Sequence, residues 1–341
     1  MRLFRHHEGL EPRFRGMVAA LGNFDGFHRG HHVVIGEAGR LARAMGAGLA
    51  VVTTEPHPVS FFARDAEPFR LTPFRERTRL LESFGVDLSL VLPFGKELAA
   101  TPAQEFVAQV LLGGIGVLHV VVGYDYRFGQ GRGGGVDVLR WMGEMEGFGV
   151  TVVEPVRFGI EGAAGAAYSS TLVRETLREG KARRAAALLG HWWSIAGRVL
   201  EGDKRGRTIG FPTANIALED SIVPALGVYA VRVVIEEDDG MPVYEGVANI
   251  GRRPTVDAGD AVLLEVFLFE FAGDLYGKHL RVEMVGFIRP EQKFDGLDAL
   301  KAQIAADCDT ARALLSDPEN ARGRLLPPTL DSYLDEHPEA P

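Results

Sequence analysis

Two histidines that stand three residues apart, His28 and His31, are the first residues whose spacing suggests chemistry. They lie at the end of the segment GNFDGFHRGH (Gly22–His31), which follows an apolar run and precedes a helical run. At a helix start this spacing directs both imidazoles to one spot, where unpaired backbone N–H groups and the helix dipole favour an anion. Gly26 and Gly30 have no side chains to keep a phosphate from the backbone. The segment is therefore a candidate phosphate-binding site.

Two other interpretations of the His28–His31 pair stay open. Paired histidines beside a turn are often surface or capping residues. A zinc site is a further alternative, but no cysteine stands nearby and no glutamate has the spacing of a metalloprotease motif.

A second group of polar residues lies in GDKRGRTIGFPTAN (Gly202–Asn215). Its basic side chains among glycines, which include Gly206 and Arg207, can close over phosphates. Thr213 and Asn215 are two residues apart in an extended segment, so their oxygens point the same way and can hold Mg²⁺ together with the phosphates it bridges. Taken alone, the segment also fits a solvated turn beside an edge strand.

Glu265 lies in the apolar run AVLLEVFLFEF and shares a strand face with Leu263, Phe267 and Phe269. A carboxylate in such a run is costly to desolvate, and a partly desolvated carboxylate suits a general base. The alternative is a strand-edge glutamate that reaches solvent.

The elements that must position these residues follow two patterns. In residues 17–156, five short apolar runs alternate with helical stretches, which is typical of a parallel sheet covered on both faces; the runs are MVAALGNF, GLAVVTTEP, LSLVLPF, VLHVVVGYDY and GVTVVEPV. In the second half, apolar residues alternate with charged ones, as in Tyr229–Glu236 and Leu280–Met284, which predicts antiparallel strands with one wet face. We therefore expect an α/β doubly wound domain followed by a barrel or sandwich.

Several helices are also predicted. Thr101–Gln104 has the residue types of a capping box at a helix start, and a helical segment covers about 171–189. A final helix from Leu297 to Leu315 carries one apolar stripe that includes Cys308, which is then a core residue. The last residues, 326–341, are rich in proline and acid and are expected to form a loose tail.

Composition limits the class of protein. A length of 341 residues favours two domains, and the net charge of −9 argues against a broad cationic face for nucleic acid. The lone Cys308 cannot form an intramolecular disulfide, which fits a cytoplasmic protein. Glycines interrupt the charge-free stretch Phe106–Tyr124, so no membrane helix is expected. An oligomer is compatible with the sequence, which does not specify one.

Four ordered motifs in the first half resemble the bacterial FAD synthetase module: GNFDGFHRGH, EPHP (Glu55–Pro58), VGYDYRFG (Val122–Gly129) and SSTLVR (Ser169–Arg174). The resemblance implies a Rossmann-like nucleotidyltransferase in which FMN phosphate attacks the α-phosphorus of ATP and pyrophosphate leaves. It implies that the ATP phosphates are held by His28, His31, Ser170, Thr171 and Arg174, and that nucleotide or flavin is positioned by Gly22, Asn23, Asp25 and Asp125. Asp125 is otherwise an ordinary turn residue after a strand.

The second half, from about 186 to 320, resembles riboflavin kinase. That family implies a small antiparallel Greek-key β-barrel with a C-terminal helix, in which Thr213 and Asn215 serve the nucleotide phosphates and Mg²⁺ and Glu265 is the catalytic base. Gly206 and Arg207 belong to the basic loop beside the nucleotide. Together the resemblances imply an adenylyltransferase domain over 1–185, a kinase domain over 186–325 and a tail over 326–341, with riboflavin, FMN and ATP as substrates.

Two rival functions remain at this point. In the first, only the kinase is active and the α/β half is a decayed nucleotide binder, because the FAD synthetase family commonly has an aromatic residue where Thr54 stands and a basic residue where Leu172 stands. In the second, the protein is a carrier whose barrel holds FMN without turnover.

Overall fold

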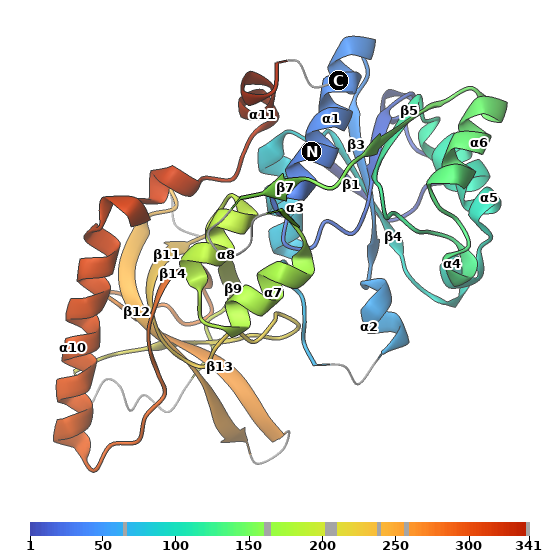
Figure 1. The fold of residues 1–341 in the computed structure, drawn as a ribbon. Coiled ribbons are helices and arrows are strands. Elements are labelled where there is room, and N and C mark those ends of the chain that lie inside the picture. Colours follow the sequence, from blue (N-terminus) through green and yellow to red (C-terminus); the bar gives the residue numbers. More distant parts are fainter. Residues whose placement is uncertain (64–66, 160–164, 202–209, 237–239, 256–258, 339–341) are drawn as a thin grey trace. The chain divides into compact units, whose positions relative to one another are not determined.

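The structure is a computed structural model that describes residues 1–341 except 64–66, 160–164, 202–209, 237–239, 256–258 and 339–341 (Figure 1). The chain divides into two compact units. The first unit comprises residues 1–66, 74–169 and 327–341, and the second comprises 67–73 and 170–326.

The first unit contains a six-stranded parallel sheet in the order β1–β4–β3–β2–β5–β6. All five strands expected from the sequence are present: β2 (Val18–Leu21), β3 (Leu49–Glu55), β4 (Leu88–Pro93), β5 (His119–Gly123) and β6 (Gly149–Val153). A further strand, β1 (Arg2–Phe4), was not expected from the sequence because it is too short to show a period. The strand order reverses direction between β2 and β5, so their carboxyl ends form the topological switch point where sheets of this kind bind ligands.

Helices cover both faces of this sheet, as the apolar runs predict. Val18 and Ala20 of β2 pack into one hydrophobic cluster with α1 and α3, whereas Ala19 and Leu21 pack into a second cluster on the other face. Before residue 170, the described helices of the unit are α1 (Arg29–Met45), α2 (Pro58–Phe62), α3 (Phe74–Phe84), α4 (Lys96–Ala100), α5 (Ala103–Phe106), the π-helical Val107–Ile115 and α6 (Val136–Glu146). A small hairpin of β7 (Arg157–Phe158) and β8 (Ala166–Ala167) completes it, with 3₁₀ turns at Pro12–Phe14 and Gln130–Arg132.

The capping box expected at Thr101–Gln104 is wrong. Pro102 is the N-cap of α5, and no side chain caps that helix. The Thr101 hydroxyl instead donates to the carbonyl of Glu97 at 3.0 Å. Because α4 ends where α5 begins, the hydroxyl is used by the preceding helix.

The C-terminal segment is also different from the expected loose tail. It forms α11 (Leu330–Glu336), which begins with a capping box between Thr329 and Ser332. Leu330 and Tyr333 are buried in the same hydrophobic cluster as α1. A Cβ at Gly36 would lie 2.3 Å from the Tyr333 ring, so the glycine on α1 leaves the space that the tyrosine fills. The proline-rich and acidic composition predicted a loose tail, although the segment also contains Leu330 and Tyr333, which pack into the core.

Tyr333→Ala is expected to lower the free energy of unfolding of the first unit by about 3 kcal/mol, because a buried aromatic side chain is lost next to a glycine. Hydrogen exchange of the β2 and β3 amides measures this change. Glu336→Ala, at the exposed end of the same helix, is the control. Equal protection of β2 and β3 in Tyr333→Ala and the unaltered protein would show that α11 contributes nothing to the unit.

The second unit is a nearly closed antiparallel barrel rather than a sandwich. Its six strands lie in the order β10–β13–β12–β11–β14–β9. An isolated antiparallel bridge between Leu200 and Asn215 joins the chain after β9 to β10 and brings the two ends of the sheet together. The bounds are β9 (Ser194–Arg198), β10 (Ala214–Ala217), β11 (Gly227–Ile235), β12 (Val243–Thr255), β13 (Gly259–Leu268) and β14 (His279–Pro290).

Helix α10 (Leu297–Ser316) packs along the barrel strands, as the apolar stripe predicts (Figure 1). Cys308, Ala311 and Leu315 are buried in one cluster with Val247 of β12, which confirms Cys308 as a core residue. Leu297, at the start of the stripe, is exposed.

The helical segment expected at 171–189 is two helices, α7 (Ser170–Arg178) and α8 (Ala182–Leu189), with a left-handed Gly180 between them. Short 3₁₀ turns lie at Pro318–Asn320 and Arg322–Leu325.

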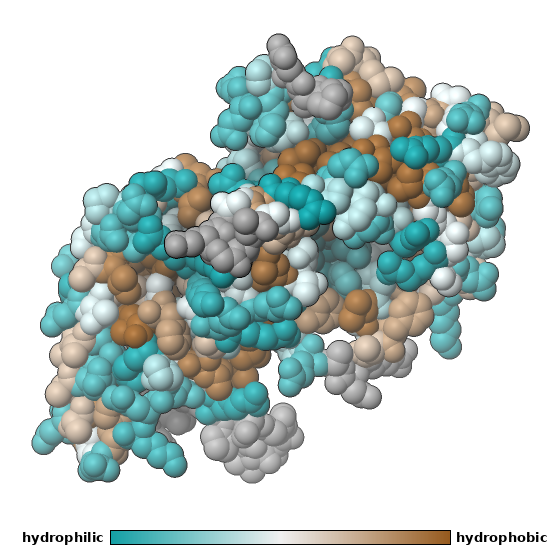
Figure 2. Space-filling model, in the orientation of Figure 1, coloured by the Kyte–Doolittle hydropathy of each residue, from teal (hydrophilic) through white to brown (hydrophobic). Residues whose placement is uncertain are grey.

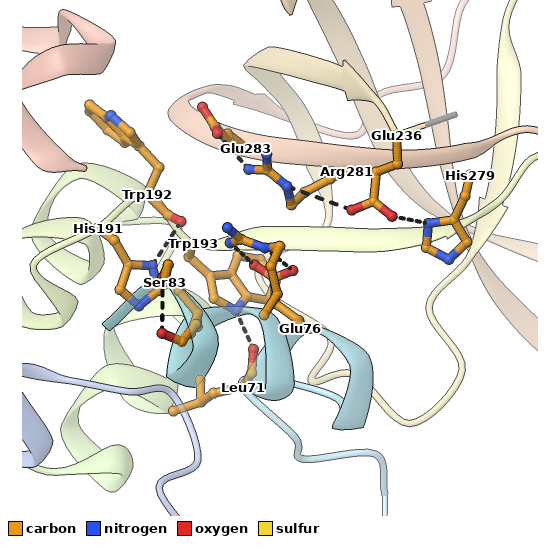
Figure 3. A network of polar contacts seen from close by, with 12 residues as sticks. Leu71, Glu76, Ser83, His191, Trp192, Trp193, Glu236, His279, Arg281 and Glu283 are labelled. Atoms are coloured by element: carbon orange, nitrogen blue, oxygen red, sulfur yellow. Dashed lines mark hydrogen bonds and ion pairs between the residues drawn. The ribbon is translucent and has the colours of Figure 1, made fainter. Parts of the chain in front are cut away.

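One expectation about the barrel is wrong: the charged residues of β11 and β14 do not lie on a wet face. Arg232 is 4% exposed and donates to the carbonyl of Leu315, at the end of α10, at 3.3 Å and to the carbonyl of Asn320, after α10, at 2.7 Å. Arg281 and Glu283 are also buried and pair at 2.8 Å, and Arg281 lies toward Glu236 (Figure 3). The chain that follows α10 covers these side chains, so their charges are paired with one another and with helix-end carbonyls.

The surface drawn in Figure 2 mixes hydrophilic and hydrophobic residues. Large apolar side chains stay exposed on α6, where Trp141 and Met145 stand one turn apart. None of the helices in the described part of the chain combines the length and the apolarity that a bilayer crossing requires.

Candidate functional site

The His28–His31 pair lies together at the start of α1. His28 is the N-cap residue, and its Nδ1 accepts a hydrogen bond from the backbone N–H of His31 at 3.3 Å. The two imidazole rings are stacked, with centroids 3.6 Å apart and planes 19° from parallel. Capping, one of the alternatives for these residues, is therefore part of the geometry. It also holds both rings at the positive end of the α1 dipole.

The loop before α1 has an unusual backbone. Phe24 and Phe27 have φ values of 51° and 44°, in the left-handed region that bulky residues rarely adopt, and both are buried. A Cβ at Gly22 would lie 2.9 Å from the Phe24 ring, and a Cβ at Gly30 would lie 3.1 Å from His28 Cε1. These glycines therefore make room for the loop's own side chains, a packing role that the sequence analysis did not consider.

A buried arginine that the sequence analysis missed joins this loop to the neighbouring strand. Arg77 of α3 is 1% exposed and donates to the carbonyl of Asn23 at 3.1 Å and to the Glu55 carboxylate at 2.8 Å. The Thr54 hydroxyl donates to Asn23 Oδ1 at 3.2 Å. A signal was available: Arg77 falls on the apolar face of its helix, at spacings of three and four from Leu80 and Leu81, and a buried cation needs acceptors.

The remaining candidates of the first unit differ in burial. Asp25, within the loop, is buried, whereas Asp125 is exposed in the turn that follows β5. Because β5 lies beside β2, Asp125 is at the same sheet edge as Asn23. The backbone N–H of Tyr126 donates to the carbonyl of Gly123 at 3.1 Å, which agrees with the turn alternative for Asp125.

Three of the predicted phosphate contacts, Ser170, Thr171 and Arg174, belong to α7 of the second unit. Ser170 is the first residue of that helix and Thr171 is exposed. The Arg174 guanidinium donates to the carbonyl of Phe69 at 2.8 Å and lies over the Phe69 ring. The five residues expected to hold the ATP phosphates are thus divided between the two units.

In the barrel, strand register places Glu265 between two asparagines. Glu265 of β13 lies directly opposite Asn215 of β10 on one side and Asn249 of β12 on the other. Directly opposed residues share a sheet face, with Cβ atoms about 5 Å apart. Glu265 is half-buried, and β13 is not an edge strand, so the strand-edge alternative for this glutamate is wrong.

Asn215 has the features of a ligand-binding amide. It is 8% exposed, and its Oδ1 accepts no hydrogen bond from any of the residues that the structure describes. Thr213, half-buried, directly precedes β10, two residues before Asn215. Gly206 and Arg207 lie outside the described residues.

Asn249 is the residue of this group that the sequence analysis missed. A polar side chain in the apolar segment GVANIG was the available signal, but its partner strand cannot be read from the sequence. A Cβ at Gly251 would lie 3.0 Å from Asn249 Nδ2 and 2.3 Å from Glu291 Oε1, so the glycine leaves space for both polar groups. On the same face, Phe267 packs against Phe211 with centroids 5.3 Å apart.

Arg289, near the end of β14, and Phe294 are in contact with each other. The Arg289 guanidinium lies 5.7 Å from the Phe294 ring centroid and forms an ion pair with Asp307 of α10 at 2.7 Å. The ion pair between Arg289 and Asp307 therefore joins β14 to α10. Among the described residues, no three His, Cys, Asp or Glu side chains gather as a metal-binding group.

Two family models match the chain, one in each half. The model described as FAD synthetase matches residues 10–165. The model described as riboflavin kinase matches residues 189–315.

Curated relatives match almost the full length. A protein of Escherichia coli K12 named bifunctional riboflavin kinase/FMN adenylyltransferase is 43% identical, over 92% of this chain and 97% of its own. The protein of the same name from Bacillus subtilis is 38% identical, over 89% and 93%. A solved structure titled as a macrolide-efflux protein from Streptococcus pneumoniae has a TM-score of 0.78 and 31% identity, covering 91% of this chain and 98% of that one.

Proposed function

The chain belongs to the family of bifunctional riboflavin kinase/FMN adenylyltransferases, which convert riboflavin to FMN and FMN to FAD with ATP, and we propose that Glu265 serves the first step and the His28–His31 pair the second. Two chemically different nucleophiles explain why the two sites differ. The ribityl hydroxyl of riboflavin is neutral, whereas the phosphate of FMN is already an anion.

Phosphorylation of riboflavin benefits from a base. Glu265 takes the proton of the ribityl hydroxyl as its oxygen attacks the γ-phosphorus of ATP and ADP leaves. The observation that carries this assignment is the position of the carboxylate between Asn215 and Asn249. The two amides flank the carboxylate, and we propose that they hold it toward the hydroxyl.

Mg²⁺ fits the donor set beside Glu265. Asn215 Oδ1 is a buried oxygen for which the described residues offer no hydrogen-bond donor, and Thr213 supplies a hydroxyl two residues earlier. Neutral oxygens together with phosphate oxygens are ligands that Mg²⁺ accepts. An ion held by Thr213 and Asn215 supplies charge neutralisation for the transferred phosphoryl group. Gly206 and Arg207 are proposed to close over the same phosphates.

Adenylyl transfer needs hydrogen-bond donors to the triphosphate rather than a general base. An oxygen of the FMN phosphate attacks the α-phosphorus of ATP, and pyrophosphate leaves. We propose that His28 and His31 donate to the triphosphate at the N-terminus of α1, where the helix dipole favours its charge. Further contacts are assigned to Gly22, Asn23, Asp25, Asp125, Ser170, Thr171 and Arg174.

The two reactions are assigned to two successive parts of the chain. We propose that adenylyl transfer belongs to residues 1–185 and phosphorylation to 186–325, which the spans of the two family models support.

The strand order β14–β11–β12–β13 supports the Greek-key path expected for the barrel. A cytoplasmic location is proposed from the single cysteine, which is buried.

The direct test of this function is to mix the protein with riboflavin, ATP and Mg²⁺ and to separate the flavins by chromatography. FAD is the expected product. FMN alone would support a kinase with an inactive α/β half, and unchanged riboflavin would support a carrier. Repeating the reaction with a chelator, and then with Mg²⁺ restored, tests the metal requirement.

Asn249→Leu is expected to lower the kcat of riboflavin phosphorylation ten- to a hundredfold, on the order of the loss that a displaced reactive group causes. The leucine keeps the side-chain size but removes the amide beside Glu265. Conversion of supplied FMN to FAD by the same variant is the internal control and should stay unchanged. An unaltered phosphorylation rate would show that Asn249 has no role in riboflavin phosphorylation.

A further inference from the structure

We infer that Arg77 is a positioning residue for adenylyl transfer, because its buried guanidinium ties the loop that carries His28 and His31 to the end of β3. The inference rests on the proposed role of the histidine pair. Arg77 is assigned no contact with substrate and acts through the loop.

The contacts of Arg77 join two separate segments. One side of the guanidinium donates from Nη1 to the backbone carbonyl of Asn23, which follows β2. The other side donates from Nη2 to the carboxylate of Glu55 at 2.8 Å, with the carbonyl of Thr54 at 3.5 Å. These acceptors belong to the ends of β2 and β3, which are neighbours in the sheet. The Arg77 side chain therefore joins the segment after β2 to the end of β3, in addition to the hydrogen bond between Thr54 and Asn23.

The geometry requires arginine rather than lysine. A guanidinium presents a planar set of donors that can reach a backbone carbonyl and a carboxylate in different directions, whereas an ammonium group is a point charge on a flexible stem. Arg77 is almost fully buried, and Glu55 is also largely covered. Removing the guanidinium leaves the Glu55 carboxylate without this cation in a poorly hydrated place.

The loop between Asn23 and His28 needs such support. It contains Phe24 and Phe27, whose left-handed backbone persists only where the surroundings hold it. The Arg77 contact holds the carbonyl of Asn23, immediately before Phe24, and the Thr54 hydroxyl holds the side chain of the same asparagine. A shift of this residue is transmitted along a short loop to the N-cap His28, and hence to the stacked ring of His31.

The test compares Arg77→Met and Arg77→Lys for conversion of FMN to FAD. Arg77→Met is expected to lower kcat about a hundredfold, the scale of a small misplacement of reacting groups, and to raise the KM for ATP. Arg77→Lys, which keeps the charge, should recover only part of that loss. Riboflavin phosphorylation by the same preparations should stay within about twofold, because the barrel does not contain this loop.

The control is Arg43→Met, which removes an arginine of α1 whose ion pair with Asp331 is exposed. It should leave FAD formation unchanged. If Arg77→Met does not fold, Thr54→Val decides: it removes only the hydroxyl contact with Asn23 and should lower kcat several-fold, and an unchanged kcat would count against the inference.

The outcomes separate this inference from the proposed function. If the His28→Ala, His31→Ala protein loses adenylyl transfer while folded Arg77→Met keeps its kcat and KM, Arg77 has only a structural task and the inference is wrong. If the double histidine variant itself makes FAD normally, the proposed site is wrong.

Discussion

Glu265→Gln is expected to stop FMN formation almost completely while the same protein still converts supplied FMN to FAD. Glutamine has the size and shape of glutamate but cannot accept the proton of the ribityl hydroxyl, so the rate of phosphorylation should fall by about 10²- to 10⁴-fold. The loss should appear in kcat, since the flavin and nucleotide contacts are kept. Chromatography of flavins formed from riboflavin and from FMN, in parallel reactions, measures both steps.

The matched control is Glu245→Gln, which makes the same change at an exposed position of β12, next to β13. It should have normal phosphorylation. FMN production at the ordinary rate by Glu265→Gln would mean that another group, or none, takes the proton. Loss of both activities would instead indicate a folding defect, and circular dichroism of the variant would reveal it.

His28→Ala combined with His31→Ala should have the opposite pattern. Both imidazoles at the start of α1 are lost, and removing even one donor from a developing anionic charge costs about 10²- to 10³-fold in rate. The pair acts at one spot, so the double variant should lose about 10³-fold rather than the product of two single losses. Riboflavin phosphorylation should continue, and FMN should accumulate.

One complication comes from the structure itself. His28 is the N-cap of α1, so its removal also weakens the helix by about 1 kcal/mol. His28→Asn supplies a capping oxygen without an imidazole and separates the two effects. Full adenylyl transfer by His28→Asn would show that the His28 imidazole is not needed, and full adenylyl transfer by the double variant would exclude both histidines from the mechanism.

Most elements were predictable because their signals are local. The strands of the first unit are continuous apolar runs, and the α10 stripe recurs every three or four residues, so both periods can be read without knowing the partners. The His28–His31 contact was predictable for the same reason, since it spans less than one helical turn. The candidate at Glu265 came from a single charge in an apolar run.

What could not be predicted depends on segments far apart in the chain. The partners of Glu265 follow from strand register, which places Asn215 and Asn249 at its two sides. The acceptors of Arg77 lie just after β2 and at the end of β3, 54 and 22 residues earlier in the chain. The buried charge of Arg232 meets carbonyls more than 80 residues later.

The sequence alone thus determined most of the strands and helices, and which residue types are available for chemistry, because backbone period and short-range spacing are properties of neighbouring residues. Only the tertiary structure decided which side chains meet, which charges are buried and which segments, such as α11, pack into a core. Those outcomes depend on register and on the packing of distant elements, and no local pattern encodes either of them.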